Sequence, residues 1–513
     1  MARLSALSAV AAIFAARGKM VNEQPVGGIM RRARSSEWRR AAPEQEWDLD
    51  ADVVVVGFGA AGACAAIGAL AEGADVLVLE RASGGGGTSA LSTGQIYLGG
   101  GTPIQRDCGF EDSAEEMYRY LMASCGPAPD EAKIRAFCDG CLEHYAWLVE
   151  QGVPFKQSYY GEGSYTPTDD CLSWSGSEQN RRYAVIAKPA PRGHTVQQAG
   201  IEAGGMLMQA LCAATEASGA RIQPDALVLQ LVLDDEHRCI GVVARIDREE
   251  RFVRARCAVV LCAGGFINHD GMVEAHAPWL RKCRFRAACE GDDGRGIRMG
   301  MSAGGHAIRM DTACIVLPFT VPKQLIKGIL VNRQGQRFVN EDAYQTVVGE
   351  AALRSQGGEV FLIVDDDIYE RPFPPTEIAA VGESIAEVQS ELGMPVGSLD
   401  HTVAFYNRHA EKGEDPLFGK TDEYLVPLRT PPFAALDYTT DAALYTVFTL
   451  GGLRTNLDGE VQTPDDVTVP GLYAAGRTTS GLAAQGYSSG LSLADATFFG
   501  RRAGRHAART RSR

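Results

Sequence analysis

Two apolar runs near the start of the chain flank a helical pattern. Four valines follow Asp52 at positions 53–56, which is typical of a strand buried on both faces of a parallel sheet. From Ala60 to about Glu72 apolar residues recur at helical spacing, and residues 74–79 form the second apolar run. Strand, helix and strand in this order predict a βαβ unit at the start of an α/β domain.

Similar patterns predict further elements up to about residue 310. Helices are expected over residues 113–124, 129–151 and 201–218, and after the glycine-rich residues 291–296. Residues 227–233 and 239–246 predict a β-hairpin. Residues 258–261 predict a buried strand that ends in a glycine turn.

The pattern changes between about residues 311 and 445. A hairpin is expected over residues 328–341 around an Arg-Gln-Gly turn, a strand over residues 361–365 and a polar helix over residues 401–414. From about residue 450 the pattern is again that of the first 310 residues, with a short strand at residues 471–476 and a closing helix from Ser489 to about Ala508. This order predicts one cofactor-binding domain that an inserted cap splits in the sequence.

We therefore predict a Rossmann-like α/β fold interrupted by an α+β catalytic cap domain. Residues 47–310 and 446–513 are expected to form the cofactor-binding domain, and residues 311–445 the cap. Residues 1–46 are expected to be a disordered extension, which would be translated from an upstream start if Met20 or Met30 is the true beginning. The alternative is a secretory signal, because Arg3 precedes a weakly apolar, alanine-rich stretch.

Composition narrows the function classes. The 513 residues carry a net charge of −14 and 45% are hydrophobic, which favours a folded α/β protein over a nucleic-acid-binding one. No run reaches the roughly 18 apolar residues of a membrane span. The 13 cysteines show no pairing rhythm, and Cys138 and Cys141 lie in a helical pattern without further ligands, so we expect structural thiols, no metal and a cytoplasmic location.

The turn after the valine run contains the clearest binding motif of the sequence. Gly57, Gly59 and Gly62 form the GxGxxG spacing that lets a backbone approach a pyrophosphate and a helix pack against its strand. The helix N-terminus then offers amides to the phosphates. The second strand ends in Glu80, a carboxylate placed to accept hydrogen bonds from a ribose hydroxyl. A glycine-rich loop follows at residues 81–94, where it could wrap a dinucleotide.

Several separated motifs in this order resemble the fumarate reductase/3-ketosteroid dehydrogenase superfamily of flavoproteins over about residues 50 to 508. They include the glycines of the first turn, the Gly-Gly-Thr-Ser loop at 86–89, Ala263-Gly-Gly265 and Ala474-Ala-Gly476. The resemblance implies a glutathione-reductase-type FAD-binding domain with FAD as cofactor. The residues that it implies at FAD are Gly57, Gly59, Ala60, Ala61, Gly62, Glu80, Arg81, Thr88, Ser89, Ser92, Gly94, Val228, Ala263, Gly264, Asp293, Gly476, Ser492 and Leu493.

The chain departs from the fumarate reductases of this superfamily in two places. Those enzymes carry arginines after an Asn-Glu pair in the cap and in the C-terminal glycine-rich segment. Here the corresponding segments, 340–345 and 484–490, contain Tyr344 and Tyr487 and no arginine. A dicarboxylate therefore loses its bidentate partners, whereas tyrosine hydroxyls suit a neutral carbonyl.

The Gly-Tyr-Ser-Ser-Gly stretch at 486–490 is most similar to that of the 3-keto-5α-steroid Δ4-dehydrogenases. This resemblance implies oxidation of a 3-keto-5α-steroid to the 4-ene-3-one in steroid catabolism. Tyr487 would bind the C3 carbonyl and stabilise the enolate. Ser489, assisted by Tyr344, would take the C4 proton while hydride passes from C5 to flavin N5.

Several alternatives stay open at this point. Tyr344 could be structural, the two serines could cap the last helix, and His194 could line the pocket or be solvated. The function could instead be Δ1-dehydrogenation, reduction of a fumarate-like enoate, or non-catalytic flavin binding. The partners expected are a hydrophobic keto-steroid and an electron acceptor, either a quinone or an electron-transfer protein, with no nucleic acid.

Overall fold

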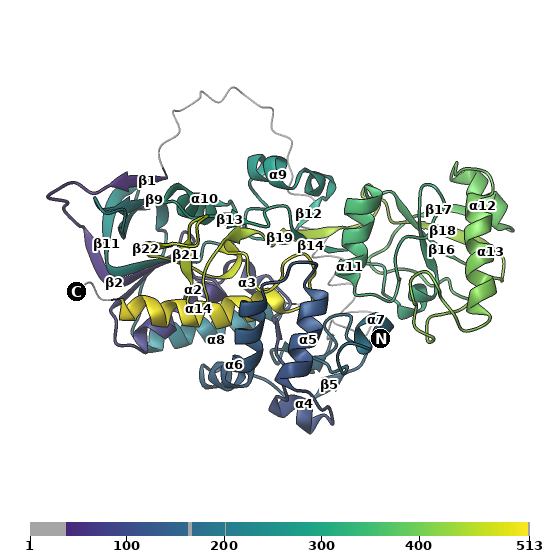
Figure 1. Ribbon diagram of the computed structural model, residues 1–513, viewed down its shortest axis with the longest axis horizontal. Helices are drawn as coiled ribbons and strands as arrows, with labels where there is room; N and C mark the ends of the chain where they lie inside the picture. Colours follow the sequence, from purple (N-terminus) through teal and green to yellow (C-terminus); the bar gives the residue numbers. More distant parts are fainter. Residues whose placement is uncertain (1–36, 163–166, 201, 511–513) are drawn as a thin grey trace.

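A computed structural model describes residues 37–162, 167–200 and 202–510 of the chain (Figure 1). Its largest sheet has the strand order β1-β9-β10-β11-β2-β3-β8, with β22 pairing to β11 and β21 to β22. The strands are β1 (Trp38–Arg40), β2 (Leu49–Val56), β3 (Val76–Leu79), β8 (Arg221–Gln223), β9 (Leu227–Leu233), β10 (Cys239–Ile246), β11 (Glu249–Leu261), β21 (Glu460–Gln462) and β22 (Thr468–Ala474). The expected buried strands and the 227–246 hairpin are confirmed.

The parallel part of this sheet explains the valine run. Strand β2 lies between β3 and β11, parallel to both, and positions 53–55 are fully buried. A strand covered on both faces has no polar side, so its sequence is continuously apolar rather than alternating. Strand β22, from the C-terminal part of the chain, pairs parallel with β11 in the same sheet.

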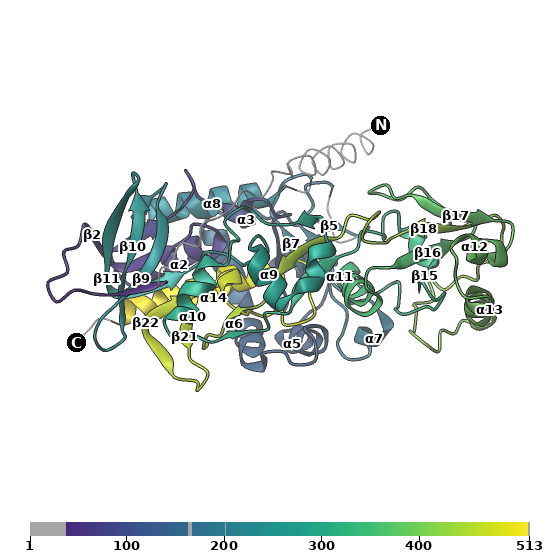
Figure 2. The ribbon, with the colours of Figure 1, turned by 90° about the horizontal axis from the view of Figure 1, so that it is seen from above.

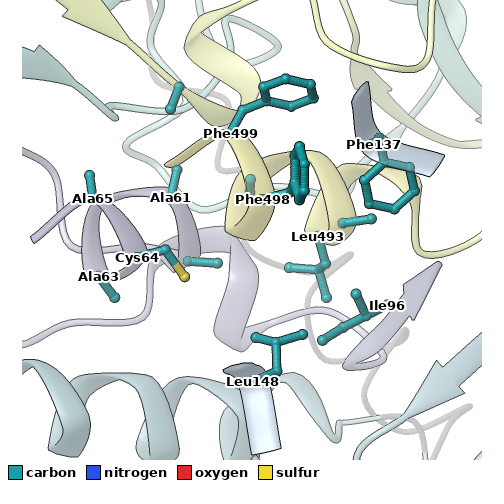
Figure 3. Packing of buried hydrophobic residues seen from close by; sticks show 14 of the residues in the cluster. Ala61, Ala63, Cys64, Ala65, Ile96, Phe137, Leu148, Leu493, Phe498 and Phe499 are labelled. Carbon is teal, nitrogen blue, oxygen red and sulfur yellow. The ribbon is translucent and has the colours of Figure 1, made fainter. Parts of the chain in front are cut away.

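Helices α2 (Ala60–Leu70) and α14 (Leu491–Arg509), from opposite ends of the described chain, pack on one another against this sheet. They lie side by side in both ribbon views (Figures 1 and 2). A Cβ atom on Gly504 would lie 1.9 Å from the carbonyl oxygen of Ala65, so only glycine permits this spacing. Phe498 and Phe499 of α14 belong to the same buried hydrophobic cluster as Phe137 and the apolar residues of α2 (Figure 3).

A second layer of helices and a small sheet continues from this core. The small sheet has the order β4-β7-β6-β5. Its strands are β4 (Gln95–Tyr97), β5 (Tyr159–Tyr160), β6 (Leu172–Ser173) and β7 (Gly193–Thr195). The helices are α3 (Gly87–Ala90), α4 (Pro103–Asp107), α5 (Ala114–Ser124), α6 (Glu131–Glu150), α7 (Arg181–Ala184) and α8 (Gly204–Ala217). The three long helices expected in this part of the sequence are therefore present.

The segment expected to form the cap occupies one end of the elongated molecule, at the right of Figure 1. Its sheet has the order β15-β16-β18-β17, and its buried apolar residues share one core with residues of the preceding segment 266–310. These elements are β15 (Ile329–Asn332), β16 (Val360–Val364), β17 (Ile378–Gly382), β18 (Phe433–Asp437), α11 (Gln345–Glu350), a π-turn at Ala351–Ser355, α12 (Ile385–Glu391) and α13 (Ser398–Ala410).

Short elements connect the two regions. The three-stranded sheet β12-β19-β14 lies between them in Figure 1, and β13 pairs with β20. These connecting elements are α9 (Asp270–His276), β12 (Phe285–Arg286), α10 (Arg295–Ser302), β13 (Ala307–Ile308), β14 (Ala313–Val316), β19 (Thr446–Thr449), β20 (Gly452–Leu453) and three 3₁₀ turns at Pro278–Lys282, Lys323–Lys327 and Gly476–Thr478.

Two sequence expectations need correction. Residues 328–341 do form a turn at Asn332–Gln336, but β15 pairs with β16, and only one isolated bridge joins Val331 to Arg337. The apolar strand β15 pairs with β16, whose five residues are all apolar and buried, whereas residues 336–341 are mostly polar. In addition, residues 38–40 of the expected extension form β1, parallel to β9. Residues 1–36, with the alternative of a secretory signal, lie outside the described residues.

Candidate cofactor and active site

The first turn of the large sheet leaves no room for side chains. Gly57 has a φ of +100°, and a Cβ atom there would lie 2.5 Å from the carbonyl oxygen of Cys262. A Cβ atom on Gly62 would lie 1.9 Å from the carbonyl oxygen of Gly57. The glycines therefore bring β2, α2 and the turn after β11 into backbone contact. This is the arrangement in which a backbone approaches a pyrophosphate.

Glu80 connects the first turn to the loop after β3. Its side chain is buried, with one carboxylate oxygen accepting from the Phe58 amide at 2.7 Å and the other from the Ala82 amide at 2.8 Å. Each carboxylate oxygen can accept a second hydrogen bond, so a ribose hydroxyl would fit beside these amides. The role of Glu80 as the ribose acceptor stays a prediction.

The glycine-rich loop folds back over the start of α2. The Ser89 hydroxyl accepts from the Ala60 amide at 3.2 Å, and Gly86 donates to the carbonyl of Phe58 at 2.8 Å. Ser92 Oγ donates to the Ser89 carbonyl at 2.7 Å. The first amide of α2, which the sequence assigns to a phosphate, thus has a serine hydroxyl as its partner in this structure.

Asp292 joins three segments of the cofactor region, and the sequence did not single it out. Its side chain is buried, accepts from the Gly265 amide at 2.5 Å and from the Thr88 hydroxyl at 2.7 Å, and forms an ion pair with Arg477 at 2.5 Å. The neighbouring Asp293 instead accepts from the Arg295 amide and pairs with Arg81 at 3.5 Å. Asp292 and Asp293 are neighbours in the sequence, and only the structure shows that they have different partners.

The side chain of Arg477 indicates that this region suits a dinucleotide. Its Nη1 atom is buried and makes no hydrogen bond within the described residues. A buried guanidinium nitrogen without an acceptor is costly, and a phosphate or a ring carbonyl of a dinucleotide would supply one. Arg477 and Ser492 help to line a cavity of about 20 Å³.

The remaining cofactor candidates lie around these elements. A Cβ atom on Gly476 would lie 2.8 Å from the Ala61 Cβ, and one on Gly264 would lie 2.1 Å from Asp292 Oδ1. Gly94 donates to the Ser92 hydroxyl at 3.2 Å. The Val228 side chain packs in the core of the large sheet, and the residue lies opposite Ala244 in the β9–β10 ladder. Ala263, Gly59 and Leu493 lie at the ends of β11, β2 and in α14, and all these roles stay predictions.

The last helix begins at the proposed carbonyl site. Gly490 has a φ of +89° and precedes α14, and the Ser492 amide donates to the Tyr487 hydroxyl at 3.3 Å. Tyr487 meets Phe448 edge-to-face at 5.5 Å between ring centroids. Burial raises the pKa of Tyr487 above its usual value, so the phenol keeps its proton. The Ser492 amide expected at the flavin edge therefore contacts Tyr487 in this structure.

One loop contacts both other catalytic candidates. The Ser489 amide donates to the Ser175 carbonyl at 2.6 Å, and the Tyr344 amide donates to the Ser177 hydroxyl at 2.8 Å. Tyr344 comes from the cap and Ser489 from the turn before α14. The structure thus brings both candidates to residues 175–177, which the sequence did not single out because they carry no recognisable motif.

The sequence expectations also include His194 and the two cysteines of α6. His194 is fully buried in β7, where its Nδ1 lies 3.2 Å from the Arg192 carbonyl and its Nε2 lies 2.8 Å from the Thr102 hydroxyl. The alternative that His194 is a solvated loop residue is therefore wrong. Burial lowers its pKa to about 4. Cys138 and Cys141 are buried free thiols in α6.

Comparisons with known proteins identify the family. A family described as FAD binding domain matches residues 52–492. The chain belongs to this family. It is an FAD-dependent oxidoreductase with the flavoenzyme fold of the fumarate reductase and ketosteroid dehydrogenase type, as the sequence motifs predicted.

Two relatives are similar over most of the chain. The 3-oxo-5-alpha-steroid 4-dehydrogenase of Comamonas testosteroni is 30% identical over 502 residues, which cover 85% of this chain and 94% of that one. The 3-ketosteroid-Δ4-(5α)-dehydrogenase of Rhodococcus jostii RHA1, solved in complex with 4-androstene-3,17-dione, is 46% identical with a TM-score of 0.87 and covers 92% of this chain and 100% of that one.

More distant structures share the fold. The 3-ketosteroid Δ1-dehydrogenase of Sterolibacterium denitrificans is 21% identical with a TM-score of 0.68, covering 90% of this chain and 99% of that one. Among the described residues, no helix combines the length and the apolar character needed to cross a membrane.

Proposed function

We propose that this protein oxidises a 3-keto-5α-steroid to the corresponding 4-ene-3-one. The observation that carries the proposal is the Tyr487 hydroxyl, which lies 3.3 Å from the Ser492 amide at the start of α14. An uncharged donor at this position suits a ketone, whereas the fumarate reductases use arginine for a carboxylate. The 46% identical relative with bound 4-androstene-3,17-dione supports the same substrate class.

Tyr487 would bind the substrate carbonyl. The Ser492 amide donates to the phenolic oxygen, so the phenolic proton remains available to donate to the C3 oxygen. As the C4 proton leaves, negative charge builds on that oxygen, and the positive end of the α14 dipole stabilises it. The raised pKa of Tyr487 keeps the phenol a donor at neutral pH.

Ser489 would take the C4 proton and pass it on through Tyr344. A serine hydroxyl is a weak base, so its efficiency depends on a well-placed acceptor for its own proton. The hydrogen bonds of both backbones to residues 175–177 hold the two residues in one arrangement. FAD, when bound, supplies the two-electron oxidant for this reaction.

The cofactor would be held by the first βα turn and the segments around Asp292. The amides of Gly59 to Gly62 would face its pyrophosphate, Glu80 its ribose and the start of α14 its ring. Residues 47–310 and 446–513 would form this FAD-binding domain, and residues 311–445 the cap that brings Tyr344 to the substrate. The steroid is the proposed partner, and a quinone or an electron-transfer protein would reoxidise the flavin.

Anaerobic mixing with 5α-androstane-3,17-dione tests the proposal. We expect loss of the visible flavin absorbance and formation of 4-androstene-3,17-dione in a single turnover. A product with the double bond at C1 would replace the proposal with Δ1-dehydrogenation. Rapid reoxidation of the reduced protein by fumarate would favour the enoate reductase alternative, and no bleaching by any keto-steroid would favour a non-catalytic flavoprotein.

A further inference from the structure

A buried loop lies directly behind the proposed catalytic residues. It follows β6 and runs from Ser175 to Glu178, and all of it except Gly176 is at least nine-tenths buried. It touches two segments that are far apart in the sequence. Its Ser175 carbonyl accepts from the Ser489 amide at 2.6 Å, and its Ser177 hydroxyl accepts from the Tyr344 amide at 2.8 Å.

Tyr120 of α5 fixes the same loop from behind. Its hydroxyl accepts from the Ser177 amide at 2.8 Å and lies 3.0 Å from the Ser488 hydroxyl. A Cβ atom on Gly176 would lie 2.2 Å from the Tyr120 hydroxyl and 2.4 Å from Ser488 Oγ. The loop is thus packed against the turn that carries Ser489, with no space for a side chain between them.

Glu178 closes the loop on itself. One of its carboxylate oxygens accepts from the Gly176 amide at 2.8 Å, and the other accepts from the Ser175 hydroxyl at 3.3 Å. These bonds link Glu178 back to the first two residues of the loop in a tight turn. A buried carboxylate whose two oxygens bond within its own loop gives that loop a defined conformation.

The loop continues into a second contact with the cap. Asn180, two residues further on, donates from its Nδ2 to Asp342 Oδ1 at 2.6 Å. Asp342 also accepts from the Thr421 amide at 2.7 Å, within the cap. The segment 175–180 is therefore bonded both to the turn before α14 and to the cap segment that carries Tyr344.

We propose that residues 175–178, with Tyr120, form a positioning element that sets Tyr344 against Ser489. This inference rests on the proposed function for its catalytic readout. Ser177 is a positioning residue, because its hydroxyl bonds only to the backbone of Tyr344 among the described contacts of that side chain. Loss of this bond would let Tyr344 drift, and a displacement of about 1 Å costs roughly 10²-fold in rate.

The test compares Ser177→Ala with Ser177→Thr, which restores the hydroxyl. We expect Ser177→Ala to slow anaerobic flavin reduction by the ketone roughly 10- to 100-fold, with ketone affinity and FAD content unchanged. Ser177→Thr should recover most of the rate. Thr215→Val is the matched control, because it removes a buried hydroxyl that bonds within α8 rather than to the loop. Loss of ketone affinity or FAD instead of rate would overturn the proposal.

Coupling to Tyr344 separates positioning from general structure. In a Tyr344→Phe background, Ser177→Ala should cause less than about a twofold further loss, because both changes disable the same residue. If the rate loss of the double variant equals the product of the two single-variant losses, the proposal is contradicted. Tyr120→Phe should show similar coupling to Ser489→Ala and serves as a second variant if Ser177→Ala does not fold.

A readout without substrate keeps this inference separate from the proposed function. Amide hydrogen exchange of peptides covering residues 341–347 should speed up in Ser177→Ala and return to normal in Ser177→Thr. Unchanged exchange would overturn the positioning role even if the ketone is a substrate. If the wild type is not bleached by the ketone, the proposed function fails, while faster exchange would still support the loop as the element that holds Tyr344.

Discussion

The cofactor region depends on close backbone contacts, whereas the proposed catalytic site depends on side-chain hydroxyls. The second region, which we call the junction, comprises residues 175–178, Tyr120, Tyr344, Tyr487 and Ser489. Around the first turn the backbone makes the site, and a Cβ atom on Gly57, Gly62 or Gly264 would collide with neighbouring atoms at 1.9–2.5 Å. At the junction, side-chain hydroxyls from separate segments make the site, among them Tyr120, Ser177 and Tyr487. The first region should therefore be sensitive to added atoms, and the second to removed ones.

Adding one methyl group to the cofactor region should have the largest effect. In Gly62→Ala the new Cβ atom would lie 1.9 Å from the Gly57 carbonyl oxygen, so α2 must move away from the turn. Overpacking of this kind costs about 1–3 kcal/mol or more, and the movement would take the amides away from the proposed pyrophosphate site. We expect a protein purified without bound FAD, as measured by its visible absorbance.

Gly205→Ala is the matched control for this change. A Cβ atom there meets only the Ala90 carbonyl oxygen at 3.9 Å, in the first turn of α8. The variant should retain FAD and gain about 0.5–1 kcal/mol of helix stability. Full FAD occupancy in Gly62→Ala would show that the close approach is not needed.

Removing one oxygen at the junction should leave FAD in place and slow the chemistry. If Tyr487 is the carbonyl donor, as proposed, the substrate carbonyl loses that donor in Tyr487→Phe, and we expect flavin reduction by the ketone to slow about 10²–10³-fold. Tyr473→Phe is the control, since its hydroxyl bonds to His506 near the far end of α14. Release of FAD from Tyr487→Phe at an unchanged rate constant would place Tyr487 in the cofactor site instead.

Tyr344→Phe should have a smaller effect of the same kind. In the proposed relay, removal of the phenolic oxygen forces the proton from Ser489 to leave by another route, so we expect a rate loss of roughly 10- to 100-fold with FAD retained. The measurement is the same anaerobic reduction, followed over a range of pH. An unchanged rate at every pH would make Tyr344 structural.

Mild acid should lower the stability of the fold through the buried ring of His194 in β7. The pKa of His194 falls from an ordinary value of 6.5 to about 4 in the fold, because burial disfavours the charged ring. A group whose folded pKa is lowered in this way costs stability as pH falls below 6.5, roughly 1 kcal/mol between pH 6.5 and 5.5. We expect the drop in Tm from pH 7 to 5.5 to be smaller in His194→Gln. An equal drop in both proteins would show that His194 does not contribute.

The difference between the regions also explains what could be predicted from the sequence. The glycine spacing, Glu80 and the buried strands depend on local backbone geometry, so the order of residues is enough to predict them. Asp292 and Arg477, in contrast, meet across 185 positions. Ser177 likewise meets Tyr344 across 167 positions, and neither pair has a local signal. The second arm of the 328–341 hairpin was predicted wrongly because β16, further along the chain, is the better partner of β15.

The proposed reaction requires that a neutral ketone binds at Tyr487 and loses a proton from C4. The most direct test is a single anaerobic turnover with 5α-androstane-3,17-dione that carries two deuterium atoms at C4. We predict a 4-ene-3-one product that retains one deuterium atom, and a slower reduction than with the unlabelled ketone. A product unsaturated at C1 with both deuterium atoms retained would contradict the account.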